Sequence, residues 1–221
     1  MGKTPIIAIT VLLAIAFLSC SEKREKSEMP NIVFILADDM GYGDVSAYNE
    51  NSKIKTPFID QLAKEGVMFT DAHTSSSVCT PTRYGILTGR YNWRSSLKSG
   101  VVSGYSKSLI EQERTTIATF LKGNGYKTAC IGKWHLGCDW SITEEDDKHR
   151  DNLNARPKVD FSKPVKNGPA THGFDYSYGF CGSLDMPPYV WVENDMPTMV
   201  STKTNNYEKI WSVNRCKTGT F

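Results

Sequence analysis

The sequence predicts an α/β domain built on a mostly parallel central sheet with helices on both faces. Short apolar runs alternate along the chain with helical patterns, and each run ends in a loop rich in glycine or charge. With 39% hydrophobic and 23% charged residues in 221, the composition is that of a globular protein. The net charge of +2 gives no sign of a nucleic-acid partner, and six cysteines are too few for a disulfide scaffold.

The N-terminus is predicted to be an export signal. Lys3 precedes an apolar run at residues 6–18, shorter than the roughly 20 residues that cross a bilayer. Residues 17–20 (Phe-Leu-Ser-Cys) resemble a bacterial lipoprotein box, which implies a signal peptide at residues 1–19 and lipidation of Cys20. An ordinary signal peptide cleaved nearby is the alternative. The polar stretch up to residue 30 suits a tether, so the protein is expected in the bacterial envelope, held to the membrane by its lipid anchor only.

The first strand, helix and second strand are expected near the start of the mature chain. Residues 32–36 form a continuous apolar run, typical of a strand covered on both faces, and they are followed closely by Asp38 and Asp39. Residues 56–66 predict a helix that opens with a Thr-Pro cap and ends at a glycine. Residues 67–69 predict a short second strand.

Two further helices and a third strand follow. Residues 74–80 form a polar loop, and residues 81–87 predict a helix that ends near a glycine. A third helix, capped at 115 or 116, extends to residue 122, and residues 127–131 predict a strand. That strand ends in residues 132–135 (Gly-Lys-Trp-His). Because ligands of parallel sheets bind beyond the carboxyl ends of the strands, the polar residues after the strands are expected at one rim.

The later part of the chain is less regular. Residues 139–168 are rich in Asp, Lys, Asn and Pro and predict a long surface excursion, and residues 172–175 (His-Gly-Phe-Asp) return the chain to the core. Trp140, Tyr189 and Trp191 are candidates to line a pocket, although buried packing is the commoner use of such side chains.

Two pairs of polar residues at strand ends suggest chemistry. Asp38 and Asp39 would repel each other unless a cation lies between them, and a hard divalent ion takes carboxylate oxygens. Solvated acids are the alternative. Lys133 and His135 carry little weight alone, because a strand-end lysine and histidine are more often solvated or packed than catalytic.

Cys79 lies where a helix is expected to start, with Pro81 in the first turn. The unpaired amides and the dipole at a helix N-terminus favour an anion, and Arg83 is spaced to reach back over the same end. Such a site would hold a tetrahedral oxyanion against residue 79. A buried structural cysteine is the alternative.

Four segments in order resemble the type I sulfatases of the alkaline phosphatase-like superfamily. They are residues 79–90, which begin Cys-Thr-Pro-Thr-Arg; residues 31–39, which end Asp-Asp; residues 132–137 (Gly-Lys-Trp-His-Leu-Gly); and residues 172–175. The resemblance extends from about residue 31 to about residue 179. Thr82 replaces a frequent serine, whereas the Cys, Pro and Arg needed for maturation are present.

The resemblance implies roles for these residues. Cys79 would be oxidised to Cα-formylglycine by a formylglycine-generating or anaerobic sulfatase-maturing enzyme, and a hydroxyl of the aldehyde hydrate would attack sulfur. Asp38, Asp39 and residue 79 would bind calcium, which lowers the free energy of forming the alkoxide. The substrate would be a sulfated small molecule or glycan.

The remaining catalytic roles follow from the same resemblance. Arg83 would hold the diol, and Lys133 would stabilise charge on the sulfate and the diol. His135 would take the proton from the second hydroxyl, which expels sulfate and restores the aldehyde.

The resemblance also implies that residues 31–221 are only the N-terminal part of a catalytic domain, with a sheet incomplete at its C-terminal end. The family's Asp-Asn or Asp-His metal pair is not found, because Asn194-Asp195 has the reverse order and comes too early. We therefore expect this chain alone to be inactive or nearly so.

Several alternatives stay open. A phosphonate or phosphodiester hydrolase of the same superfamily would use the same nucleophile, and a non-catalytic, envelope-anchored anion-binding protein would keep the pocket without turnover. For substrate, residues 183–190 are similar to segments of arylsulfatases and N-acetylgalactosamine-6-sulfatase-like members, so a carbohydrate or aryl sulfate is expected.

The remaining cysteines and histidines have no assigned role. Pairing among Cys130, Cys138, Cys181 and Cys216 is left open, as is the alternative that they are free and buried. His73 and His149 have no motif around them.

Overall fold

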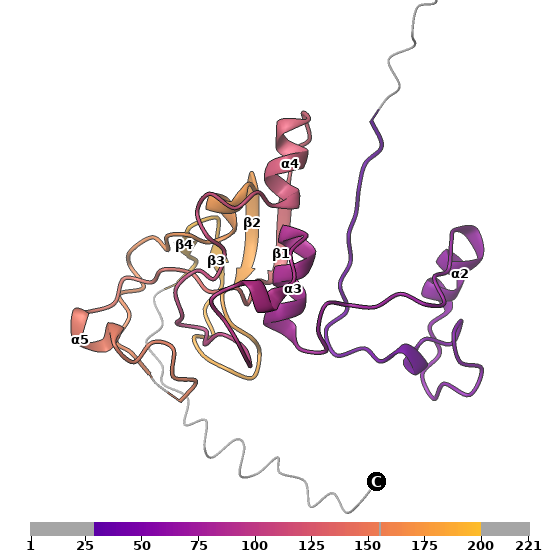
Figure 1. Cartoon of the computed structure of the whole chain (residues 1–221), viewed down its shortest axis with the longest axis horizontal. Helices are drawn as coiled ribbons and strands as arrows, with labels where there is room; N and C mark the ends of the chain where they lie inside the picture. Colours follow the sequence, from indigo (N-terminus) through magenta and orange to yellow (C-terminus); the bar gives the residue numbers. More distant parts are fainter. Residues whose placement is uncertain (1–28, 155, 200–221) are drawn as a thin grey trace, which may run out of the picture. The chain divides into compact units, whose positions relative to one another are not determined.

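The computed structural model describes residues 29–154 and 156–199 (Figure 1). The chain divides into two compact units, of which the first ends at Pro57 and the second begins at Phe58. The predicted signal peptide and the predicted lipidation site, Cys20, lie outside the described residues. None of the helices within the described ranges is long and apolar enough to cross a membrane.

Side-chain hydrogen bonds organise the loops of the first unit, which contains a short 3-10 helix, η1 (Tyr42–Asp44). Ser46 and Thr56 are tied reciprocally, because the backbone N–H of each donates to the hydroxyl of the other, at 3.0 and 2.9 Å. The Ser52 hydroxyl donates to the Asp44 carbonyl at 2.7 Å. These bonds satisfy backbone groups that no regular element pairs.

Two predicted strands are not formed. Residues 32–36 and 67–69 are assigned to no strand, and their side chains are exposed, with Ile35 at 83% and Val67 at 79%. A strand is stable only where a neighbouring strand pairs its N–H and C=O groups, and the described residues give these two segments no such neighbour. The apolar pattern predicts strand-forming tendency, whereas pairing depends on the rest of the sheet.

The three predicted helices are confirmed. They are α2 (Pro57–Glu65), α3 (Cys79–Thr88) and α4 (Ile117–Gly123). Helix α3 begins two residues earlier than expected and ends at Gly89, whose φ of 63° is the left-handed conformation that suits glycine. Helix α4 contacts α3, and a second 3-10 helix, η2 (Asn92–Arg94), follows α3.

The sheet of the described residues is mixed. Its strands are β1 (Ala129–Lys133), β2 (Tyr176–Phe180), β3 (Val192–Glu193) and β4 (Met196–Pro197), in that order. Strands β1 and β2 are parallel, so that Lys133 is level with Phe180, while β3 and β4 continue antiparallel. The third predicted strand is therefore found, two residues later in the chain than expected. Figure 1 shows β1 and β2 side by side.

The excursion between β1 and β2 is confirmed as mostly irregular. It contains a short helix, α5 (Glu144–Asp147), and is closed by isolated bridges that pair Asp139 with Lys166 and Ile142 with Val159. The chain returns through η3 (Pro169–His172), whose last residue is buried.

Two apolar clusters form the core of the second unit. One joins α3 to the end of β1, and the other joins the excursion to β3. Their buried members are Tyr84, Val102, Leu109, Ile110, Trp134 and Leu136 in the first and Tyr105, Cys138, Trp140, Val165, Cys181 and Val192 in the second. Trp140 thus serves packing, and it meets Phe161 edge-on at a ring distance of 5.6 Å.

The three aromatic side chains proposed as a pocket lining are absent from the lining of the small cavity found in the described part of the chain. Tyr189 and Trp191 are 43% and 44% exposed, and the Trp191 ring stacks on Tyr178 at 5.0 Å. A small apolar cavity lies instead between the sheet and the returning chain, and its lining includes Cys130, Val165 and Phe180.

Thr116 joins α4 to the turn that precedes β2. Its hydroxyl accepts a hydrogen bond from the Thr119 N–H at 3.1 Å and donates to the His172 carbonyl at 2.6 Å. We expect Thr116→Val to lower the free energy of unfolding by about 1–2 kcal/mol, because the helix cap and the buried bond are both lost. Urea denaturation measures this. Thr115→Val, at the exposed neighbour, should change stability little, and equal losses in both variants would contradict the assignment.

Candidate active site

Helix α3 begins at Cys79 with an N-terminus that no side chain caps. Val78, the N-cap residue, is extended and makes no side-chain cap hydrogen bond, and no acidic residue lies in the first turn. Cys79 is half-buried and its thiol is free. Uncapped amides and the helix dipole make this end suitable for an anion.

Arg83 and Lys133 are joined by a hydrogen bond. The Arg83 Nη1 donates to the Lys133 carbonyl at 2.6 Å, so the guanidinium one turn into α3 is held at the end of β1. Both residues are half-buried. This bond brings together two predicted segments that are 50 residues apart in the chain.

Thr80 makes the second link between the same two segments. Its side chain is fully buried, and its hydroxyl donates to the His135 carbonyl at 3.0 Å and accepts from the Val102 N–H at 3.3 Å. Sequence reasoning gave Thr80 no role, because its two hydrogen-bond partners are 55 and 22 residues away in the chain.

His135 is held with one ring nitrogen satisfied and the other open. Its side chain is fully buried, and Nε2 lies 2.9 Å from the Val102 carbonyl. Because a carbonyl only accepts, Nε2 carries the proton and donates. The lone pair is therefore on Nδ1, which is buried and has no hydrogen-bond partner among the described residues. Such a nitrogen can take a proton from a reacting group.

The electrostatics keep this imidazole neutral. Burial is the largest effect and, with the nearby positive charges of Lys133 and Arg83, lowers the pKa of His135 to about 4. The hydrogen bond with Val102 and the negative charge of Asp185 oppose that shift. At neutral pH the ring is therefore uncharged.

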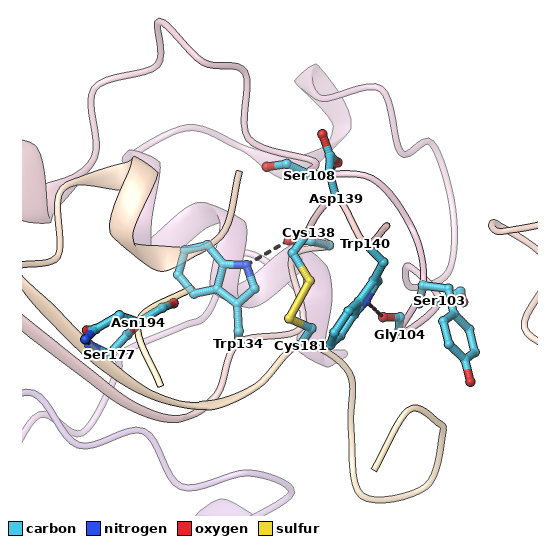
Figure 2. Close-up of a disulfide and its surroundings, with 12 residues drawn as sticks. Ser103, Gly104, Ser108, Trp134, Cys138, Asp139, Trp140, Ser177, Cys181 and Asn194 are labelled. Carbon is cyan, nitrogen blue, oxygen red and sulfur yellow. Dashed lines mark hydrogen bonds between the residues drawn. A yellow bond between two sulfur atoms is a disulfide. The ribbon is translucent and has the colours of Figure 1, made fainter. Parts of the chain in front are cut away.

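The cysteines divide into a linked pair and free thiols. Cys138 and Cys181 form a disulfide beside Trp134 and Trp140, as Figure 2 shows. The sequence had left this pairing open, and the described residues decide it. Cys130 is free, and burial raises the pKa of its thiol to about 11, against the opposing effect of Arg83. Cys130 is thus an unreactive thiol at neutral pH. Cys216 lies outside the described residues.

The two predicted metal ligands, Asp38 and Asp39, lie in the first unit. Both are exposed, and Asp39 has a φ of 59°, in the turn that follows the extended segment. Carboxylate oxygens match the preference of calcium, which takes roughly six to eight oxygens. Among the described residues no group of three or more His, Cys, Asp or Glu side chains could hold a metal ion. The described aspartates thus fit calcium chemically but supply only part of a ligand set.

The Thr80 hydroxyl is expected to stabilise the site. Thr80→Val should lower the free energy of unfolding by about 1–3 kcal/mol, because the buried His135 carbonyl and Val102 N–H lose their partner. Thermal or urea unfolding measures the loss. Thr80→Ser keeps the hydroxyl and should retain most of the stability, so a serine variant as unstable as the valine variant would contradict the role of these bonds.

Buried histidines should make the fold sensitive to mild acid. His135 and His172 both have a pKa lowered mainly by burial, so the unfolded chain binds protons more readily than the folded chain below about pH 6.5. Stability is therefore expected to be full above that pH and to fall as pH decreases toward 4. Urea midpoints at pH 7.5 and 5 measure the difference. His73→Asn should leave it unchanged, because His73 is exposed. A midpoint that does not move between the two pH values would refute the expectation.

Comparison with known proteins places the chain in a family. Residues 30–205 match the family model described as Sulfatase. The chain is 38% identical over 192 residues to N-acetylgalactosamine-6-O-sulfatase of Bacteroides thetaiotaomicron, covering 84% of this chain and 34% of that protein. It is 35% identical over 181 residues to human arylsulfatase D, covering 78% and 27%.

A solved structure gives the same result. One described for the metabolism of multiple glycosaminoglycans by Bacteroides thetaiotaomicron matches with a TM-score of 0.67 and 37% identity, over 79% of this chain and 33% of that chain. This agrees with the predicted α/β fold class. The chain spans roughly a quarter to a third of the curated relatives it matches. From the family match and these identities, the chain belongs to the sulfatase family.

Proposed function

We propose that the protein to which this chain belongs is a sulfuric ester hydrolase with residue 79 as its nucleophile. The observation that carries the proposal is the joining of α3 to the end of β1, by the Arg83–Lys133 and Thr80–His135 hydrogen bonds. These bonds fix two segments of the chain against each other. One segment carries Cys79 and Arg83, and the other carries Lys133 and His135. An anion-binding helix end, two cations and a neutral base are the groups that sulfate transfer requires.

Cys79 would be the site of modification to Cα-formylglycine. The hydrated aldehyde supplies an oxygen nucleophile for sulfur. Cys79 suits this role because it is free, half-buried and at the start of α3, whereas Cys138 and Cys181 are cross-linked and Cys130 is a protonated thiol. The partner would be a formylglycine-generating or anaerobic sulfatase-maturing enzyme.

The other residues would handle charge and protons. Overall, water and a sulfate ester give an alcohol and sulfate, with the S–O bond to the alcohol broken. Arg83 and Lys133 are positively charged and would stabilise the negative charge that grows on the sulfate oxygens. His135 would accept a proton at Nδ1, the ring nitrogen that carries the lone pair. Asp38, Asp39 and residue 79 would contribute to a calcium site, and the ion supplies positive charge that favours an ionised nucleophile.

A carbohydrate sulfate is the first candidate substrate, and an aryl sulfate the second. Support comes from the relatives, whose names specify N-acetylgalactosamine-6-O-sulfate and aryl sulfates.

We further propose that the protein is exported to the bacterial envelope and lipidated at Cys20, as the N-terminal sequence predicts. The competing candidates are a phosphonate or phosphodiester hydrolase and an anion-binding protein without turnover, since either could use the same helix end.

Modification of Cys79 tests the proposal directly. When the chain is coexpressed with a maturing enzyme, mass spectrometry should find the peptide that spans residue 79 with its thiol replaced by an aldehyde, and an aminooxy probe should label it. Cys79→Ala should abolish labelling, and Cys130→Ala should not. An unmodified Cys79 in protein from the native host would overturn the proposal and favour the binding protein.

Substrate class is tested on matched esters of one alcohol. The matured protein is expected to release sulfate from an aryl sulfate faster than it cleaves the matching phosphonate or phosphodiester, and the opposite ratio would favour the phosphorus-based alternative. Because the chain spans roughly a quarter to a third of its relatives, we expect little turnover from the 221-residue chain alone. Modification of Cys79 is therefore the primary readout.

A further inference from the structure

We propose that the disulfide between Cys138 and Cys181 is a positioning element of the candidate active site, holding the turn that carries His135 against the end of β2. The positioning role rests on the proposed function, because His135 exchanges a proton only if the protein is the proposed hydrolase. The cross-link itself is a structural claim that can be tested without turnover.

The ladder between β1 and β2 continues beyond the two strands. The Trp134 N–H donates to the Phe180 carbonyl at 3.1 Å, and the His135 N–H donates to the Cys181 carbonyl, also at 3.1 Å. Cys181, whose carbonyl accepts the hydrogen bond from the His135 N–H, is therefore also one of the two cysteines of the disulfide. Any movement of Cys181 would be transmitted directly to the backbone of His135.

The other half of the disulfide closes the turn after His135. Cys138 lies three residues further on, and its N–H donates to the Ser106 carbonyl at 2.9 Å. Within the turn, the Trp134 indole N–H donates to the Gly137 carbonyl at 2.9 Å. Gly137 has a φ of 73°, and a Cβ there would overlap the Lys107 carbonyl, so only glycine fits. Both cysteines are buried, at 0% and 4% exposure.

His135 needs such support because of its backbone conformation. Its φ of 52° is left-handed, which is unfavourable for a residue with a Cβ and persists only where the surroundings impose it. The Val102 carbonyl fixes the ring on one side, and the turn closed by the disulfide fixes the backbone on the other. With both anchors in place, the orientation of Nδ1 is determined.

The disulfide is also protected from a free thiol that lines the same cavity. Cys130 lies in β1 and lines the same small cavity as Cys181. Thiol–disulfide exchange requires a thiolate, and burial raises the pKa of Cys130 to about 11. At neutral pH, Cys130 therefore remains protonated and does not attack the Cys138–Cys181 bond.

The test compares hydrogen exchange of the full chain with and without the cross-link. The disulfide is removed in the variant C138A/C181A, and separately by a phosphine acting on the folded wild-type chain. In that reaction the S–S bond breaks, the phosphine is oxidised to its oxide with oxygen from water, and the two water protons complete the two thiols. C130A, which removes a cysteine of β1 outside the disulfide, is the matched control.

We expect a local loss of protection. The amides of Trp134 and His135 should exchange about tenfold faster or more without the disulfide, while the Phe120 amide inside α4 keeps its rate, because opening would be confined to the turn. C130A should exchange like the wild type. If the double variant does not fold, the phosphine-treated wild type gives the same comparison.

Three results would overturn the proposal. Parallel loss of protection at Phe120 and His135 would mean that the disulfide stabilises the whole fold and not the turn in particular. Unchanged exchange would mean that the turn is stable without the disulfide. Free thiols at Cys138 and Cys181 in the exported protein would mean that no disulfide exists. None of these readouts depends on modification of Cys79. An unmodified Cys79 in the same sample would reject the proposed function and leave the structural result standing.

Discussion

The candidate site depends on one buried hydroxyl, that of Thr80. It donates to the carbonyl of His135 and accepts from the N–H of Val102, so that three segments of the chain meet at one atom. Thr80 and His135 are both fully buried. Without the hydroxyl, two backbone groups would lose their hydrogen bonds in an apolar interior, which is among the more unfavourable local changes a fold can undergo. The Arg83–Lys133 bond reinforces the same junction.

Burial at this junction also determines its electrostatics. Two positive side chains and a histidine lie close together, and protonation of all three would be strongly unfavourable. Because burial and the two cations lower the pKa of His135 to about 4, the histidine is neutral when Lys133 and Arg83 are charged. The same surroundings therefore hold two positive side chains beside an uncharged imidazole that does not repel them. The Val102 carbonyl selects the tautomer by accepting from Nε2.

Strands β1 and β2 are tied together at both ends, and this keeps the junction in place. At their beginning, the Thr128 N–H donates to the Asp175 carboxylate at 3.0 Å, and Lys122 of α4 forms an ion pair with the same carboxylate at 2.8 Å. The Lys122 hydrogen bond is the main reason that the pKa of Asp175 falls to about 2. At their end, the ladder extends to Cys181 and is closed by the disulfide. Lys133 and His135 thus lie at or just beyond the end of a strand pair that is fixed at each terminus.

The sequence by itself determined the helices, the long excursion, the family resemblance and the choice of candidate site residues. Helix caps and glycine ends are local signals. For this reason the predicted ends of α3 and α4 lie within two residues of the observed ends. Tertiary structure alone decided which elements pair. The apolar run at residues 32–36 is unpaired in the described chain, and the disulfide partner of Cys138 is 43 residues away. The role of Thr80 and the tautomer of His135 were equally inaccessible, because each depends on a backbone group from a distant segment. Strand pairing, buried hydrogen bonds and cross-links are all made between residues far apart in sequence, and a local pattern carries no information about its partner.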